Sequence, residues 1–464
     1  MIFLRAIPPT FLIDSSLTAG LDSPWCEALR MKKSIVEVCK AWWQVGVELL
    51  YQEISIRRVG QISALRRTLD ATKGIGDLIK SIEVFCFIPS GYLLLFEVDL
   101  VRIFELGPRI TRFIFGAHAS VSTAEHVLSC IGLPSSLHEA CSNLTDLQCN
   151  SPMDSVHLVS ALLVCVNLRS LWICISSKDS PDEVMAIRRP VCLARLQTLR
   201  LMIDSTNERV LPTIALHWLM PTLHNVVIDE LNSIADFTSS NYREDFFTAF
   251  GACLRYLHIR PYRGTANTYH IDVQSCIKHC PVLEHLAICP SLRLLTPLSH
   301  LTVKWIDLWT SPRGDDENYI ELRESLSHKA FPSLIGLREL DHGLSVMTDW
   351  PLILPPDSEL DVDGVEYRFP GVYVKHTARG IFKMDLIYYG ENGKQSEISD
   401  GGSFDDRCSA IASDSDSSYI PSDSASDECY SSGGSDADDL EQEEEMVDDV
   451  DHDMALTIFA QTHG

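Results

Sequence analysis

The chain has 464 residues and is 45% hydrophobic, so it can bury a large core. A single compact core rarely grows beyond roughly 250–300 residues, which argues against one compact domain and favours a lengthwise array. Residues 391–464 hold 21 acidic residues against Lys394 and Arg407, a balance of −19 out of the total of −26, which leaves −7 for residues 1–390. A mildly acidic body argues against nonspecific nucleic-acid binding.

The cysteines and apolar stretches predict an intracellular protein, cytoplasmic or nuclear. The 15 cysteines are scattered, odd in number and often occupy apolar repeat positions such as Cys149 and Cys174, which is typical of reduced thiols. Residues 1–13 are apolar but lack the features of a signal peptide. The longest apolar stretch, residues 156–175, is interrupted by polar side chains, so no membrane span is predicted.

Residues 1–70 predict a helical region. Ser34 and Glu37 have the spacing of a capping box, which predicts that a helix begins at Ser34. Apolar residues at helical spacing from Ile35 to Leu49 predict that it continues that far. A second helix is predicted over Ile62–Leu69.

An apolar phrase, Leu-x-x-Leu-x-(Ile/Leu), recurs through residues 71–342. Its copies begin at Ile79, Ile110, Leu144, Leu168, Leu196, Leu223, Leu254, Leu283 and Val303, with a possible tenth strand near Leu334–Leu340. Steps of 20 to 34 residues between copies are typical of a solenoid in which each unit packs on its neighbours. Each phrase predicts a short parallel strand, and residues 241–253 and 316–329 predict helices between strands.

The C-terminal part of the chain divides in two. Residues 343–390 contain the predicted strands Val365–Phe369, Val372–Lys375 and Ile381–Tyr388, which we interpret as a cap on the last repeat. Residues 391–464 are rich in Ser, Asp, Glu and Gly, so they predict a disordered tail. The predicted fold class is α/β, with a curved parallel sheet between a helical head and this acidic tail.

The head carries a family resemblance. Val38-Cys39, Trp42 and Leu49-Leu50-Tyr51 resemble the second half of an F-box, the helical motif that docks onto the Skp adaptor of cullin-RING ubiquitin ligases. With the phrase Arg57-Arg58-Val59-Gly60-Gln61-Ile62 and the repeats behind it, the chain resembles fungal F-box proteins with degenerate leucine-rich repeats. The usual Leu-Pro-x-Glu-Ile opening has no counterpart, and residues 1–4 look like the end of that first helix.

The resemblance implies a leucine-rich-repeat-like solenoid and a non-enzymatic substrate receptor that binds a Skp-type adaptor, a cullin ligase and a protein target. It implies that five residues either pack inside the F-box or touch the adaptor: Val38, Cys39, Trp42, Leu49 and Tyr51. From the residues alone, an ordinary helical cap on the solenoid explains this segment equally well.

A target-binding surface is predicted on the strands. Side chains between the apolar positions of each phrase point away from the buried side. We predict a concave patch that recruits a protein target, because Trp, Tyr and Arg are frequent hot-spot residues; it is centred on Trp172, Arg200, Tyr256, Arg260 and Trp305. The alternative is a solvated sheet face whose aromatic residues are covered by loops.

Other motifs are weak. Cys276, His279, Cys280 and His285 cluster without the recurring spacing of a zinc site, so packing is favoured and no metal or cofactor is predicted. Nothing assembles a nucleophile with a base, so the chain is not predicted to be an enzyme.

The tail contains three candidate phosphorylation sites, Ser413, Ser424 and Ser435, each with Asp three residues on. A tail that competes with a target for Arg200 and Arg260 is one hypothesis, and a plain solubilising tail is the other. Two further functions stay open: a repeat scaffold without a ubiquitin role, and an acidic-tail binder of basic proteins such as histones.

Overall fold

The computed structural model describes residues 7–13, 23–116, 142–153, 155–175, 190–203, 210–230, 241–261, 269–289, 292–294, 297–310, 317–341, 344, 349–356, 360, 364–369 and 372–383. Every described residue belongs to one compact unit, Met1–Tyr388. The predicted disordered tail and its candidate phosphorylation sites Ser413, Ser424 and Ser435 lie outside the described residues.

The fold is mixed α/β and is organised around one large, mostly parallel sheet. Its strands pair almost in chain order, and the spatial order is β1 (Glu53–Ile56), β2 (Ser81–Val84), β3 (Arg112–Phe115), β4 (Asp146–Met153), β5 (Ser170–Ile175), β7 (Thr198–Ile203), β9 (Asn225–Glu230), β10 (Tyr256–Pro261), β12 (His285–Ile288), β14 (Trp305–Thr310), β15 (Gly336–Asp341), β18 (Gly380–Lys383), β17 (Val372–Thr377) and β16 (Val365–Phe369). In this order, all pairs from β1 to the β15–β18 pair are parallel. At the end of the sheet, β17 pairs antiparallel with both β18 and β16.

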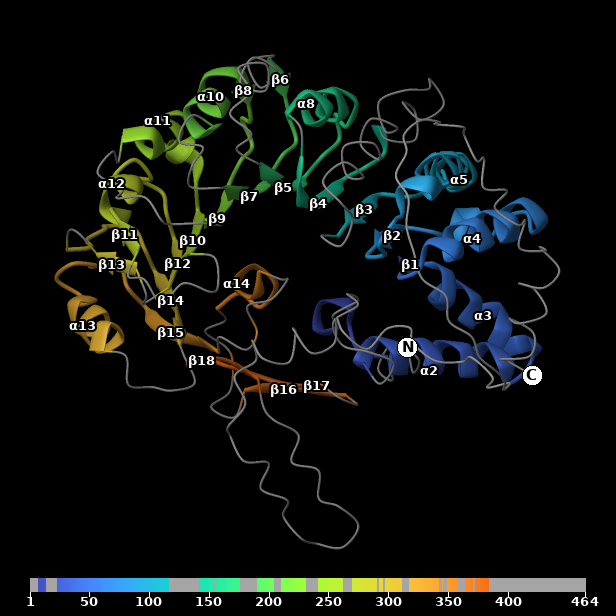
Figure 1. Cartoon of the computed structure of the whole chain (residues 1–464). Coiled ribbons are helices and arrows are strands. Elements are labelled where there is room, and N and C mark those ends of the chain that lie inside the picture. The colour runs from blue at the N-terminus through green and yellow to red at the C-terminus, as the bar shows by residue number, and fades with distance from the viewer. Residues whose placement is uncertain are drawn as a thin grey trace, which may run out of the picture. The chain divides into compact units, whose positions relative to one another are not determined.

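Helices connect most of these strands. They are α4 (Val59–Ala71), α5 (Leu93–Leu106), α8 (Ser155–Val164), α10 (Val210–His217), α11 (Asn241–Phe250), α12 (Val273–Ile277) and α13 (Glu317–Ser325). Figure 1 shows them along the outer side of the curved run of strands, while α14 (Trp350–Ile353) lies on the inner side. Two short pairs, β6 (Val191–Cys192) with β8 (Trp218–Leu219) and β11 (Tyr269–Ile271) with β13 (Leu292–Leu294), join the connecting segments.

The recurring phrase explains the sheet. A strand is found at each predicted copy, including the tenth, and it begins two residues after the first residue of the phrase. The central apolar residue of one phrase pairs with that of the next, as in Leu171 with Leu199 and Leu257 with Leu286. These side chains belong to one continuous core and are fully buried between the strands and the outer helices. A shift of one residue would turn each row away from the helices, so the phrase fixes the register.

The head consists of two helices, α2 (Pro24–Glu37) and α3 (Lys40–Tyr51). The prediction that a helix begins at Ser34 is wrong, because α2 begins at Pro24 and the hydroxyl of Ser23 accepts a hydrogen bond from the backbone N–H of Cys26. A proline at the first helical position favours that start, because its φ is already helical and it has no N–H to satisfy. α2 ends at Glu37, and Val38 and Cys39 separate it from α3, so the apolar residues expected on one helix lie on two.

Two features of the N-terminal region were not predicted. Strand β1 lies inside the predicted helical region and pairs with β2 through Ile54 and Ile82, so the sheet begins before the first phrase. The 3-10 turn η1 (Thr10–Leu12) reaches the other end of the unit, where the ring of Phe11 makes edge contacts with Trp350 at 6.0 Å and Tyr367 at 5.9 Å between centroids.

Candidate functional site

The inner face of the sheet, which is the face opposite the outer helices, carries a cluster of charged and aromatic side chains. One row runs across seven neighbouring strands in register, and we call it the inner row: Trp172, Arg200, Val227, His258, Ala287, Asp307 and Arg338. Its members alternate along each strand with the leucines that face the helices. The inner face is therefore the part of the sheet that the outer helices leave uncovered.

A buried group of charges lies at the centre of this face. Arg200 Nε donates to Asp229 Oδ2 at 2.6 Å, and Arg260 Nε donates to Asp229 Oδ1 at 2.8 Å. The guanidinium of Arg200 also stacks on the ring of Trp172, 3.5 Å from its centroid, in a cation–π contact. Burial alone would raise the pKa of Asp229, but the two arginines outweigh it and hold the pKa well below its usual range.

A second charged pair lies further along the inner row. Arg338 clasps Asp307 with two hydrogen bonds, from Nε to Oδ1 at 2.8 Å and from Nη2 to Oδ2 at 2.6 Å, and both side chains are fully buried. His285 Nε2 lies 2.8 Å from Asp307 Oδ2. Burial raises the pKa of Asp307, but His285 and Arg338 outweigh it and lower the pKa to about 2.

A short segment covers the middle of the inner face. We call Asp349–Leu354, which includes α14, the strap. Asp349 Oδ1 accepts hydrogen bonds from Tyr256 Oη at 3.0 Å and from His258 Nδ1 at 2.8 Å. Leu352 packs against a small apolar cluster of Val227, Tyr256 and Ala287. Burial and the charge of Asp349 raise the pKa of Tyr256 well above its usual range.

The structure brings together four of the five residues predicted to bind a target. Arg200 and Arg260 both bind Asp229, and Trp172 stacks on Arg200. Tyr256 binds Asp349 of the strap. Arg200 and Tyr256 are buried, whereas Trp172, Arg260 and Trp305 are partly exposed. Trp305 lies in register with His285 on the neighbouring strand, on the row beside the inner row. Their binding role stays a prediction, and the strap covers part of the predicted patch.

Sequence reasoning missed the residues that complete this cluster. Asp229 follows the phrase at Leu223, and Arg338 lies in the tenth phrase. Both are charged residues at positions that alternate with the apolar ones, and this pattern could have placed them on the inner face. Asp349 carries no such signal, because its contacts with Tyr256 and His258 join residues that are 93 and 91 positions apart.

The predicted adaptor-binding residues lie on the α2–α3 hairpin. All residues from Glu37 to Val45 are exposed, and Leu49 and Tyr51 are partly exposed. Four of the exposed residues are large and apolar, and we call them the head cluster: Val38 at 59%, Trp42 at 41%, Trp43 at 52% and Val45 at 58% exposure. Gly46 lets the helices pack closely, since a Cβ there would lie 2.8 Å from Val36 Cγ1.

The weak zinc motif is explained by packing. Cys276 and Cys280 are buried, their thiols donate to the carbonyls of Asp272 and Cys276, and burial raises the pKa of Cys280 to about 12. His279 contacts Glu244 and His285 contacts Asp307, so the two imidazoles have other partners. Among the described residues, no cluster of His, Cys, Asp and Glu could hold a metal ion.

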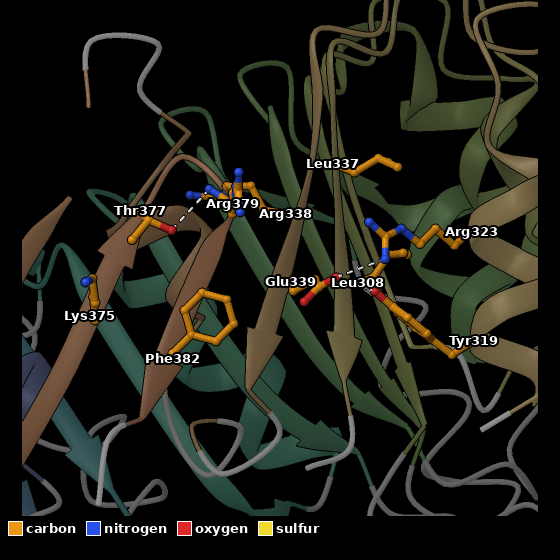
Figure 2. A pocket seen from close by; sticks show the side chains of 10 residues that line it. All are labelled: Leu308, Tyr319, Arg323, Leu337, Arg338, Glu339, Lys375, Thr377, Arg379 and Phe382. Carbon is orange, nitrogen blue, oxygen red and sulfur yellow. Dashed lines mark hydrogen bonds and ion pairs between the residues drawn. The ribbon is translucent and has the colours of Figure 1, made fainter. Parts of the chain in front are cut away.

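A pocket of about 650 Å³ lies where β15 and β18 pair over only two residues. Figure 2 shows its lining from β14, β15, α13, β17 and β18. Three of its basic side chains form ion pairs: Arg323 with Glu339, Arg338 with Asp307, and Lys375 with Glu366. Most of its positive charge is therefore compensated by carboxylates, and it contains none of the predicted target-binding residues.

Comparison with known proteins gives no family. No protein-family model matches the chain, and no curated protein matches it either. Within the described residues, no helix has both the length and the apolar character needed to cross a bilayer.

Proposed function

We propose that this chain is a non-enzymatic substrate receptor of a Skp-cullin-F-box ubiquitin ligase. The head would dock the Skp-type adaptor, and the strands with their outer helices would form a leucine-rich-repeat-like solenoid that holds a protein target. Rate enhancement would come from proximity, by holding the target near the ubiquitin donor. The role requires an intracellular compartment, cytoplasmic or nuclear, and neither cofactor nor metal.

The head cluster is the observation that carries this proposal. Four large apolar side chains exposed within eight residues, two of them tryptophans, are costly to leave in water and favour an interaction site. Trp side chains are enriched among interface hot spots, because one ring buries a large area. The head cluster includes two of the positions that the F-box resemblance assigns, Val38 and Trp42, and a third, Cys39, is exposed beside them.

The sheet supports the second half of the proposal. In-register parallel strands, most of them followed by an outer helix, leave an inner face on which only the short α14 lies. Such curved arrays present extended binding surfaces. The inner face also holds Trp, Tyr and Arg side chains, which are the residue types that contribute most to protein–protein affinity.

Co-purification with a Skp-type adaptor tests the proposal. The full chain should retain the adaptor on an affinity resin, and Val38→Asp with Trp43→Ala should reduce the retained amount at least tenfold. A matched control replaces Leu94 and Val98, two exposed apolar residues on α5, by serine. The control should bind as the unchanged chain does. Adaptor binding that the head substitutions leave intact, or no binding by the unchanged chain, would point to a repeat scaffold without a ubiquitin role.

A further inference from the structure

The strap brings a second carboxylate to the charged group at the centre of the inner face. Arg200 and Arg260 carry two positive charges and Asp229 supplies one negative charge. Asp349 is close enough to both arginines to act electrostatically on each of them, and it supplies the second negative charge. Both arginines therefore favour a negative charge at this position.

The hydrogen bonds define what kind of group sits there. The indole N–H of Trp309 is a donor only, and it lies 2.8 Å from His258 Nε2. The single imidazole proton is therefore on Nδ1, which donates to Asp349 Oδ1, and Tyr256 Oη donates to the same oxygen. Two neutral donors pointing at one place, with arginines beside them, form a site for a carboxylate.

The strap fills this site incompletely. Asp349 Oδ2 is buried and has no hydrogen-bond partner among the described residues, and the same is true of the indole nitrogen of Trp172. An unpaired buried polar atom costs about 1–3 kcal/mol. The helix of the strap spans only Trp350–Ile353, so its stability depends on its contacts with the sheet. A segment with better-matched polar groups could therefore replace it.

We propose that the inner face binds a short segment of a target protein in which an acidic residue precedes an aromatic and an aliphatic residue, and that the strap occupies this site in the free protein. The inference rests on the proposed role of this face in holding a target. The strap supplies the pattern: Asp349 enters the carboxylate site, Trp350 is buried beside Phe11, and Leu352 covers the apolar cluster.

An intramolecular segment competes strongly with a free one, because its effective concentration is on the order of millimolar. A target that binds in the micromolar range would meet an occupied site until the strap is weakened. The strap is short, so a free segment has only a few contacts to replace. At the end of the strap, Arg338 Nη1 donates to the carbonyl of Leu354 at 2.8 Å, which joins that end to β15.

The test uses a fluorescein-labelled peptide of residues 346–356 added to the full chain. The variants Asp349→Ala and Leu352→Ala weaken the strap in different ways, and each should bind the peptide at least tenfold more tightly than the unchanged chain in fluorescence anisotropy. A control peptide with Asn in place of Asp349 should bind the variants at least tenfold more weakly than the acidic peptide. Far-UV circular dichroism establishes that the variants are folded.

A second measurement needs no variant. At millimolar peptide, the strap amides of the unchanged chain should exchange hydrogen faster, while β10 amides near Tyr256 stay protected. The proposal is overturned if no folded variant binds the peptide, if the acidic and Asn peptides bind equally, or if strap exchange does not respond. Failure of adaptor binding would remove the ligase role without changing these results, so the two proposals can fail separately.

Discussion

The Asp307–Arg338 pair allows a quantitative test of how the inner face contributes to stability. Asp307→Asn keeps the size and shape of the side chain but removes its charge. The guanidinium of Arg338 would then stay buried, with 0% of its side chain exposed, and would lose its counter-ion. Removing one partner of a buried ion pair costs about 3–5 kcal/mol, because the other charge is left uncompensated. We expect a loss of about that size.

Urea unfolding of the full chain, followed by far-UV circular dichroism, measures this loss. The matched control is Glu284→Gln in the Lys304–Glu284 pair, whose atoms lie 3.1 Å apart with side chains 47% and 45% exposed. An exposed pair contributes about 1 kcal/mol or less, so its removal should barely move the urea midpoint. If Asp307→Asn costs no more than the control, then burial does not determine the value of these charges and the reasoning is refuted.

Two further predictions concern pH and the head. The pKa of Asp307 is lowered to about 2 in the folded chain, so its contribution to the free energy of unfolding is complete above the unfolded pKa near 4 and is lost as the pH falls through 2. About 2 kcal/mol should disappear over this window in the unchanged chain but not in Asp307→Asn. Urea midpoints at several pH values measure this difference. Equal losses in both chains would contradict the assignment. In the head, Gly46→Ala should cost about 1–3 kcal/mol by crowding Val36, whereas Gly60→Ala, with open space around the new methyl group, should stabilise by about 0.4–1 kcal/mol; shifts of Tm in the same direction would disprove the packing argument.

The regular part of the fold could be predicted because the sequence repeats its own pattern. Each phrase places apolar residues on one side of a short strand, as with Leu168, Leu171 and Ile173, and burial against the outer helices requires the same side in every copy. The helices at residues 241–253 and 316–329 were likewise predicted, and α11 and α13 lie there. Periodicity carries this information because neighbouring units bury each other's apolar surfaces.

The irregular parts could not be predicted in the same way. The start of α2 depended on competition between two helix starts, and Ser34 has the right spacing for a cap although the chain before it is already helical. Strand β1 has one apolar pair, Ile54 and Ile56, which is too short a pattern to distinguish from a turn. The strap meets the sheet through contacts that span more than ninety residues, and local sequence contains no trace of such a pairing.

The contact of Phe11 with Trp350 and Tyr367 constrains how this chain can evolve. Proteins made of successive strand–helix units commonly change length by duplicating or deleting a unit. Here one added strand would displace one end of the sheet by about 4.8 Å relative to the other, more than a ring contact tolerates. The Phe11 contacts therefore limit the number of strand–helix units: this number can change only if the N-terminal segment changes in length at the same time.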